Sequence, residues 1–200
     1  YEINGDIKNL DLMNIYTIVG KSFRINGIIK KAELNIEKND DSTPYPRILT
    51  KIDFQKGNID DLQFNNLKMT AFYRNSRFLI SDLQLDTYLG NIKGDGWINL
   101  ALSDKGVHFN GDEKLDLSFT YENVDISEFN RYLPWGYKSV GLMTGAIDVK
   151  GSIANPEIVS SIEIDAPGFD KINAEKIKGI FEYNDNLLNS NFSIETKYGM

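Results

Sequence analysis

The residues of this chain that could support catalysis are few and scattered. The 200 residues contain one histidine, His108, and no cysteine. A Ser–His–Asp triad, a histidine metal site or a histidine acid–base pair would have to be built around that one side chain, and thiolate chemistry is excluded. His108 lies between Val107 and Phe109 beside an Asn-Gly pair. We therefore interpret it as a strand histidine that faces solvent.

Adjacent carboxylates are the other candidates for acid–base or calcium chemistry. They are Asp40-Asp41, Asp60-Asp61 and Asp112-Glu113. Each pair lies at a turn signal, where solvated acids are common, and none has the spacing of an EF-hand. Gly94-Asp95-Gly96 is followed by a strand-like segment, not by the helix that a phosphate loop requires. We predict no catalytic residue, no metal site and no cofactor.

The charge balance excludes one class of partner. Lys and Arg together number 22 and Asp and Glu 29, which gives a net charge of −7 and a pI of about 4.8. Because the lysines are spread singly, the chain has no basic patch for a phosphate backbone, and nucleic acid is not an expected partner. No apolar run approaches the roughly 20 residues of a membrane span. The chain starts and stops inside an alternating pattern, which indicates a piece of a longer protein.

The dominant pattern along the chain is a two-residue alternation of apolar and polar side chains. This period is typical of strands with one buried face. For example, Leu115, Leu117, Phe119 and Tyr121 alternate with polar residues. Short turn signals separate the runs, namely Asn26-Gly27, Lys56–Asn58, Asn75-Ser76, Asp95-Gly96, Asn110-Gly111, Pro167-Gly168 and Asn184–Asn186. The sequence therefore predicts an antiparallel all-β protein, with residues 1–200 as one continuous sheet and a mobile loop at about 37–46.

One segment carries helix-start signals instead. Asp125 precedes Glu128 by three residues, as in a capping box, and Val124 and Phe129 have the spacing of a hydrophobic staple. Pro134 ends the segment. We expect a short helix over about 126–133, lying on the apolar side of the sheet. Its apolar side chains are either a corner plug or a lid over a groove; the candidate lid residues are Phe129, Tyr132, Leu133 and Trp135.

The spacing of glycines between the strand segments resembles that of a known family. The segment GLMTGAIDVKGSIANPEI, residues 141–158, has Gly141, Gly145 and Gly151 around its strands and then Asn155-Pro156. It resembles the recurring phrase of the TamB/AsmA-like proteins. Two further stretches are similar to repeats of that family: residues 57–102, with the Tyr88–Gly96 segment inside them, and Asn123–Ile126 with the helix that follows. The resemblance covers roughly residues 50–200.

The resemblance implies a long curled antiparallel sheet, a β-taco or β-groove, with a hydrophobic concave face. Such proteins are bridge-like lipid carriers of the bacterial envelope. An N-terminal helix anchors them in the inner membrane, and they cross the periplasm. They move phospholipid to the outer membrane or take part in outer-membrane protein assembly and secretion. This chain would then be a periplasmic segment with its anchor elsewhere.

The alternation supplies a compatible mechanism, in which apolar side chains on one face hold phospholipid acyl chains as the transported ligand. The expected lining residues are Leu67, Met69, Ala71, Tyr73, Leu83, Leu85, Ile98, Leu100, Leu102, Leu115, Leu117, Phe119, Ile147, Val149, Ile162, Ile164, Phe181 and Tyr183. An alternative is a chaperone-like scaffold whose open sheet edges pair with strands of an outer-membrane β-barrel protein. Such edges would also let the fragment self-associate. A polysaccharide-acting β-helix enzyme would need a column of stacked carboxylates, and the sequence has none in register.

Overall fold

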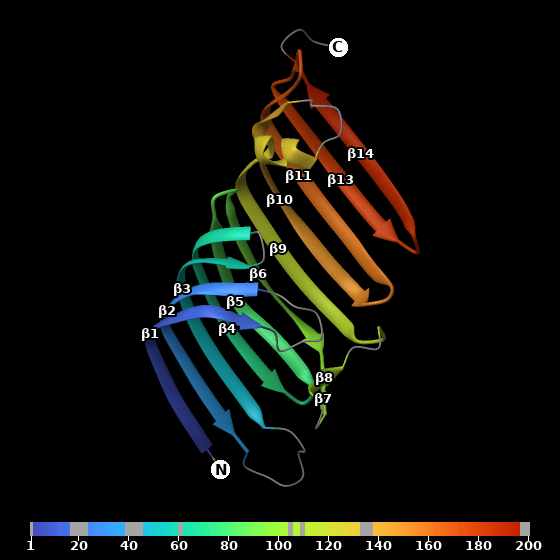
Figure 1. The fold of residues 1–200 in the computed structure, drawn as a ribbon. Coiled ribbons are helices and arrows are strands. Elements are labelled where there is room, and N and C mark those ends of the chain that lie inside the picture. Colours follow the sequence, from blue (N-terminus) through green and yellow to red (C-terminus); the bar gives the residue numbers. More distant parts are fainter. Residues whose placement is uncertain are drawn as a thin grey trace.

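The computed structural model describes residues 2–16, 24–38, 46–59, 62–103, 106–108, 111–132 and 138–196. In these ranges the chain is almost entirely β-strand, with one short 3₁₀ helix (Figure 1). The elements are β1 (Glu2–Tyr16), β2 (Arg24–Glu37), β3 (Arg47–Ile59), β4 (Leu62–Arg74), β5 (Arg77–Thr87), β6 (Asn91–Asn99), β7 (Ala101–Ser103), β8 (Gly106–His108), β9 (Lys114–Asp125), η1 (Ile126–Tyr132), β10 (Ser139–Ser152), β11 (Pro156–Phe169), β12 (Ile172–Asn173), β13 (Lys176–Asn184) and β14 (Leu187–Glu195).

Twelve of these strands form one open antiparallel sheet. Its order is β1-β2-β3-β4-β5-β6-β9-β10-β11-β13-β14, and β12 pairs with β11 off this path. The remaining two strands, β7 and β8, form a separate hairpin between β6 and β9. The sheet does not close into a barrel. The predicted all-β antiparallel fold is therefore confirmed, and strands adjacent in sequence are neighbours in space almost throughout.

Four of the expected turns are wrong, because the strands continue through them. Asn26-Gly27 lies inside β2, Lys56–Asn58 inside β3, Asp95-Gly96 inside β6 and Pro167-Gly168 inside β11. Residues in these segments adopt positive φ angles, 142° at Gly27 and 48° at Lys56. Such conformations bend or bulge a strand as readily as they reverse it. In contrast, Asn75-Ser76 does join β4 to β5 as expected.

The bends lie near one end of the strands and curl the sheet. Asn9 in β1 has φ of 52° and no partner in the β1–β2 register, and Asn65 is an extra residue between Phe64 and Asn66 in the β4–β5 register. Further along, Asn123 in β9 and Ala166 in β11 have φ of 56° and 47°. In Figure 1 the ends of β1 to β4 turn sharply and cross over the rest of the sheet. Bulges at matching heights therefore produce the curl.

The predicted short helix is present as the 3₁₀ helix η1. The carboxylate Oδ1 of Asp125 accepts a hydrogen bond of 2.9 Å from the Ser127 N–H, as expected for a helix cap. The helix packs against β10. Asn130 fixes it there, because its amide Nδ2 donates to the Ser139 carbonyl and its Oδ1 accepts from the Ser139 N–H. The side chains of Phe129 and Tyr132, and all of Leu133 and Trp135, lie outside the described residues.

Candidate functional site: the apolar face of the sheet

The strand register aligns apolar side chains into rows that cross the whole sheet. Directly opposed residues on neighbouring strands present their side chains on the same face. One such row contains Gly5, Leu34, Thr50, Ala71, Ile80, Gly96, Leu117, Val149, Ile158, Tyr183 and Leu188. No charged residue interrupts it. We call the face that carries this row the apolar face.

Two parallel rows on the same face are equally free of charge. The first contains Ile7, Ala32, Ile52, Met69, Leu83, Gly94, Phe119, Ile147, Ser160, Phe181 and Ser190. The second contains Leu10, Ile29, Phe54, Leu67, Leu85, Ile92, Tyr121, Gly145, Ile162, Gly179 and Phe192. The three rows together form a continuous apolar strip from β1 to β14.

The structure brings nearly all of the expected lining residues onto this face. Tyr73, Ile98 and Leu115 lie in a further row, and Ile164 lies opposite Ile177. Two of the expected residues differ from the rest. Leu100 follows the end of β6, and Leu102 is in the separate hairpin, where its side chain is not described.

Sequence reasoning missed the contribution of β1 to β3. Ile7, Ile29 and Phe54 belong to the rows, but the alternation around them is broken by unpaired residues such as Lys30, which shifts the β2–β3 register. A bulge shifts every following residue of the strand by one position. After the bulge, strict alternation therefore assigns residues to the wrong face of the sheet. The correct assignment of faces becomes clear only when the strand register shows which residue has no partner.

Glycines and aromatic residues pair across neighbouring strands on the apolar face. The pairs are Gly57–Phe64, Gly94–Phe119, Gly145–Tyr121 and Gly179–Phe192. A Cβ atom added at any of these glycines would lie 2.3 to 2.6 Å from an atom of the opposed aromatic side chain. Each aromatic side chain therefore lies across its glycine instead of standing away from the sheet. The rings therefore do not protrude from the sheet at these positions, and we call these four glycine–aromatic pairs the floor of the apolar face.

Tyr121 shows how a polar atom is accommodated on that floor. Its ring crosses Gly145, and its hydroxyl donates a 3.2 Å hydrogen bond to the Ser161 carbonyl on the strand beyond. Burial raises the pKa of the Tyr121 hydroxyl. Tyr73 uses the same device, donating a 3.2 Å hydrogen bond to the Leu100 carbonyl. Both hydroxyls are thus satisfied by backbone and leave the strip apolar.

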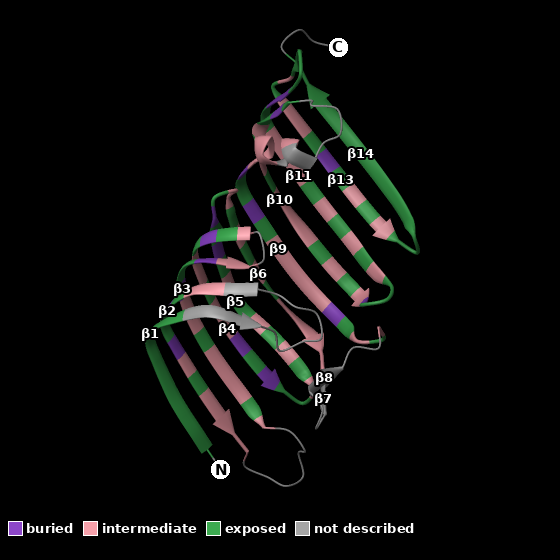
Figure 2. Cartoon of the chain, viewed as in Figure 1, coloured by how far each residue is buried: buried purple, intermediate pink, exposed green. Residues whose placement is uncertain are grey.

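In the described part of the chain, the bent ends of β1 to β4 turn over one side of the strip, and no separate sheet or long helix packs on the rest of it (Figure 1). Apart from η1 on β10 and the small hairpin strands, each strand contacts its neighbours in the sheet. No described side chain is less than 2% exposed, and residues in the middle of the strip are mostly half-buried. At the two outermost strands the apolar residues are exposed, as Figure 2 shows for the whole of β14.

The opposite face is polar and laced with ion pairs between strands. The Lys176 Nζ lies 3.1 Å from the Asp165 carboxylate and also pairs with Glu163, which raises the pKa of Lys176. Lys150 lies 3.9 Å from Asp116 on the neighbouring strand. Within β2, Glu33 pairs with Lys31 of the same strand, which lowers the pKa of the Glu33 carboxyl and raises that of Lys31. The sheet is therefore amphipathic, with alternate residues on opposite faces.

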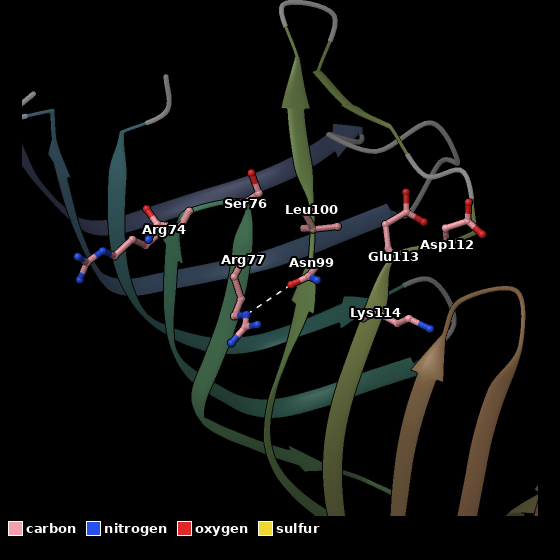
Figure 3. A pocket seen from close by; sticks show the side chains of 9 residues that line it. Arg74, Ser76, Arg77, Asn99, Leu100, Asp112, Glu113 and Lys114 are labelled. Atoms are coloured by element: carbon pink, nitrogen blue, oxygen red, sulfur yellow. Dashed lines mark hydrogen bonds between the residues drawn. The ribbon is translucent and has the colours of Figure 1, made fainter. Parts of the chain in front are cut away.

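A polar cavity of about 680 Å³ lies at the ends of β4, β5, β6 and β9 (Figure 3). Arg74, Arg77, Asn99, Asp112 and Glu113 are among its lining residues. The Asp112-Glu113 pair is thus near basic side chains, and the Glu113 carboxylate accepts a 2.8 Å hydrogen bond from the Gly111 N–H. The other two acidic pairs lie outside the described residues, as does the side chain of His108.

Among the described residues there is neither a cluster of metal ligands nor a helix that could span a membrane. No group of three or more His, Asp or Glu side chains is arranged to hold a metal ion in the described ranges. No helix in those ranges is long and apolar enough to cross a bilayer. Comparison with family models, with curated proteins and with solved structures gave no match.

Proposed function

We propose that this chain is a non-enzymatic lipid-carrying segment, similar in kind to the TamB/AsmA-like envelope proteins, whose apolar face holds phospholipid acyl chains. One observation carries the proposal. Charge-free rows run in register across eleven neighbouring strands, and apart from the bent ends of β1 to β4 the described residues supply no layer to cover them. A globular protein buries such a surface, so an uncovered strip of this extent indicates an apolar ligand.

The dimensions suit a long flexible hydrocarbon. Eleven strands spaced by about 4.8 Å give a strip about 50 Å long. The acyl chains of two opposed leaflets span about 30 Å, so one chain needs roughly a third of the strip. Each CH₂ removed from water contributes about 0.8 kcal/mol. Partial contact therefore suffices for binding, and several chains can occupy the strip at once.

The evenness of the floor favours movement along it. Where an aromatic side chain lies across a glycine, as Phe119 does on Gly94, no bulky group stands up to separate one binding position from the next. Apolar contact is also non-directional. An acyl chain can consequently exchange one set of contacts for an equivalent set on the next strands. The charged head group stays in solvent along the open side of the sheet.

Photocrosslinking tests the proposal with adjacent residues as matched controls. A photoreactive amino acid at Leu117 or Ile147 lies on the apolar face, whereas at Ser118 or Asp148 it lies on the polar face of the same strands. We expect labelled phospholipid to crosslink at the first two positions and not at the last two. Equal crosslinking on both faces, or none on the apolar face together with no lipid co-purifying, would exclude the carrier function.

A second candidate function is the chaperone-like scaffold for outer-membrane β-barrel proteins. The observation in its favour is that β1 and β14 each have one strand neighbour among the described residues. The unpaired backbone of such an edge can add a strand from a partner. Asn191→Pro in β14 would abolish an edge-based function, whereas Ile147→Gln would abolish a groove-based one. Measuring both activities in both variants separates the two candidates.

A further inference from the structure

The polar face contains one apolar row of its own. Leu49, Phe72, Leu79 and Trp97 lie directly opposite one another on β3, β4, β5 and β6. They share this face with residues such as Lys51 and Lys68, not with the apolar strip. Phe72 is 39% exposed and Leu79 is 36% exposed. Four large apolar side chains are thus presented side by side on a face that is otherwise polar.

Three arginines follow the same row toward the ends of the strands. Arg74 lies directly opposite Arg77, and Arg47 precedes Ile48, which lies opposite Tyr73. The three guanidinium groups therefore come from adjacent positions on β3, β4 and β5, and all three residues are exposed. Figure 3 shows Arg74 and Arg77 on their neighbouring strands, at the polar cavity.

One of these arginines joins the two rows. The Arg77 guanidinium carbon lies 4.1 Å from the centre of the Trp97 ring, and its Nε donates a 3.4 Å hydrogen bond to the Asn99 side chain. This stacking holds a positive charge directly beside the exposed apolar row. We call the seven residues Leu49, Phe72, Leu79, Trp97, Arg47, Arg74 and Arg77 the arginine–tryptophan patch.

Several lysines of the polar face form ion pairs, although others, such as Lys68, form none among the described residues. Lys31, Lys93, Lys150, Lys176 and Lys178 each form an ion pair with an acid. None of the three patch arginines does so within the described residues. In a chain of net charge −7, three adjacent arginines with no ion pair among the described residues form a local concentration of positive charge.

We propose that the arginine–tryptophan patch docks onto the surface of a phospholipid membrane that contains anionic lipid. Arginine forks match the oxygens of lipid phosphates. The exposed side chains of Phe72 and Leu79, with half-buried Trp97 beside them, would insert at the boundary between head groups and acyl chains. Each basic residue near an anionic surface adds binding energy, and the patch supplies three. Nearby acids reduce this attraction; they are Glu37 opposite Arg47, Asp116 opposite Trp97, and Asp112 and Glu113 at the cavity.

The patch and the apolar strip are on opposite faces, so docking does not depend on acyl chains being carried. A membrane contact through β3 to β6 would leave the strip free along its whole length. It would also orient the strand ends at the polar cavity toward the bilayer. The two proposals can therefore fail independently.

Vesicle co-sedimentation of the full chain tests the docking. We expect binding to vesicles of phosphatidylcholine with phosphatidylglycerol, weaker binding at high salt, and little binding to phosphatidylcholine alone. The triple variant Arg47→Gln, Arg74→Gln, Arg77→Gln should bind about a hundredfold more weakly, since three basic residues are lost. The control variant Lys150→Gln, Lys176→Gln, Lys178→Gln removes the same charge from β10 and β13 of the polar face and should bind like the wild type.

A second variant separates membrane insertion from simple charge attraction. Phe72→Ser with Leu79→Ser keeps all three arginines and changes only exposed side chains, so the fold is retained. We expect this variant to lose most of the vesicle binding, and soluble glycerol phosphate not to compete. The proposal is overturned if the wild type ignores anionic vesicles, if the arginine and lysine triple variants bind equally, or if glycerol phosphate displaces the protein completely.

Discussion

The same alternating sequence pattern leads to different burial of apolar side chains in the bent N-terminal strands and in the flatter C-terminal strands. In the first region the ends of β1 to β4 turn over the sheet, and Ile29, Phe54, Phe64 and Leu85 gather into a buried cluster. Phe54 and Phe64 meet edge to face, with ring centres 6.1 Å apart. In the second region β10 to β14 keep their apolar residues half-buried or exposed. An alternating pattern of apolar and polar residues is therefore compatible both with a buried core and with an uncovered apolar face.

The difference shows that curvature, not composition, decides which apolar residues become core. Where bulges bend the strands, apolar side chains of β2 to β5 pack into a buried cluster. Where the strands stay flatter, residues of the same kinds remain half-buried or exposed. A lipid-carrying function would depend on the uncovered apolar residues of the flatter strands. The stability of the fold would depend mainly on the buried cluster of the bent strands.

The largest effect should separate two phenylalanines that each lie opposite a glycine. Phe64 is 3% exposed and Phe192 is 47% exposed. Phe64→Ala should lower the free energy of unfolding by about 3 kcal/mol or more, because it empties a buried site. Phe192→Ala should cost only about 1 kcal/mol, since nearly half of its surface is already exposed in the folded chain. Urea unfolding of both variants gives the comparison, and equal losses would contradict it.

A smaller effect should appear at the glycines of the floor. A Cβ at Gly145 would lie 2.1 Å from the Ser161 carbonyl oxygen and 2.4 Å from the Tyr121 hydroxyl. Gly145→Ala should therefore cost about 2 kcal/mol through displaced neighbours. Gly5 is the matched control, because a Cβ there meets nothing within 4 Å. If thermal unfolding shows Gly5→Ala to be as destabilising as Gly145→Ala, the floor model is wrong.

The smallest effect concerns two tyrosine hydroxyls, that of Tyr73 on β4 in the bent region and that of Tyr121 on β9, beside the flatter region. Tyr121→Phe and Tyr73→Phe each remove one 3.2 Å hydrogen bond to a carbonyl and should cost about 1 kcal/mol.

The pH dependence of stability gives a second test of the Tyr121 hydroxyl. The folded-state pKa of Tyr121 is raised above the ordinary value of 10.0, so the folded state holds this proton more tightly than the unfolded chain. Its contribution to stability is complete below pH 10 and falls as the pH rises through the folded-state pKa. Tyr121→Phe should therefore flatten the loss of stability above pH 10. An unchanged alkaline profile in urea unfolding would refute this.

Much of the local structure could be predicted from the sequence. The alternation around Leu117 and Phe119 defines strands with one apolar face, because neighbouring side chains on a strand point to opposite sides. Asn75-Ser76 marks a hairpin, and both residues adopt the positive φ angles that such a tight turn needs. Asp125 caps the one helix through a short-range contact. Each of these features depends on a few consecutive residues.

Only the tertiary structure decided how those strands are bent and what each apolar residue meets. Gly27 and Lys56 have turn-like sequences, yet the strands on both sides remain paired and only bend, since their neighbours hold them in the sheet. Register across strands determined that Phe119 lies on Gly94 and Tyr121 on Gly145. The sequence by itself determined an amphipathic antiparallel sheet. Long-range pairing decided where that sheet folds into a core and where it stays open.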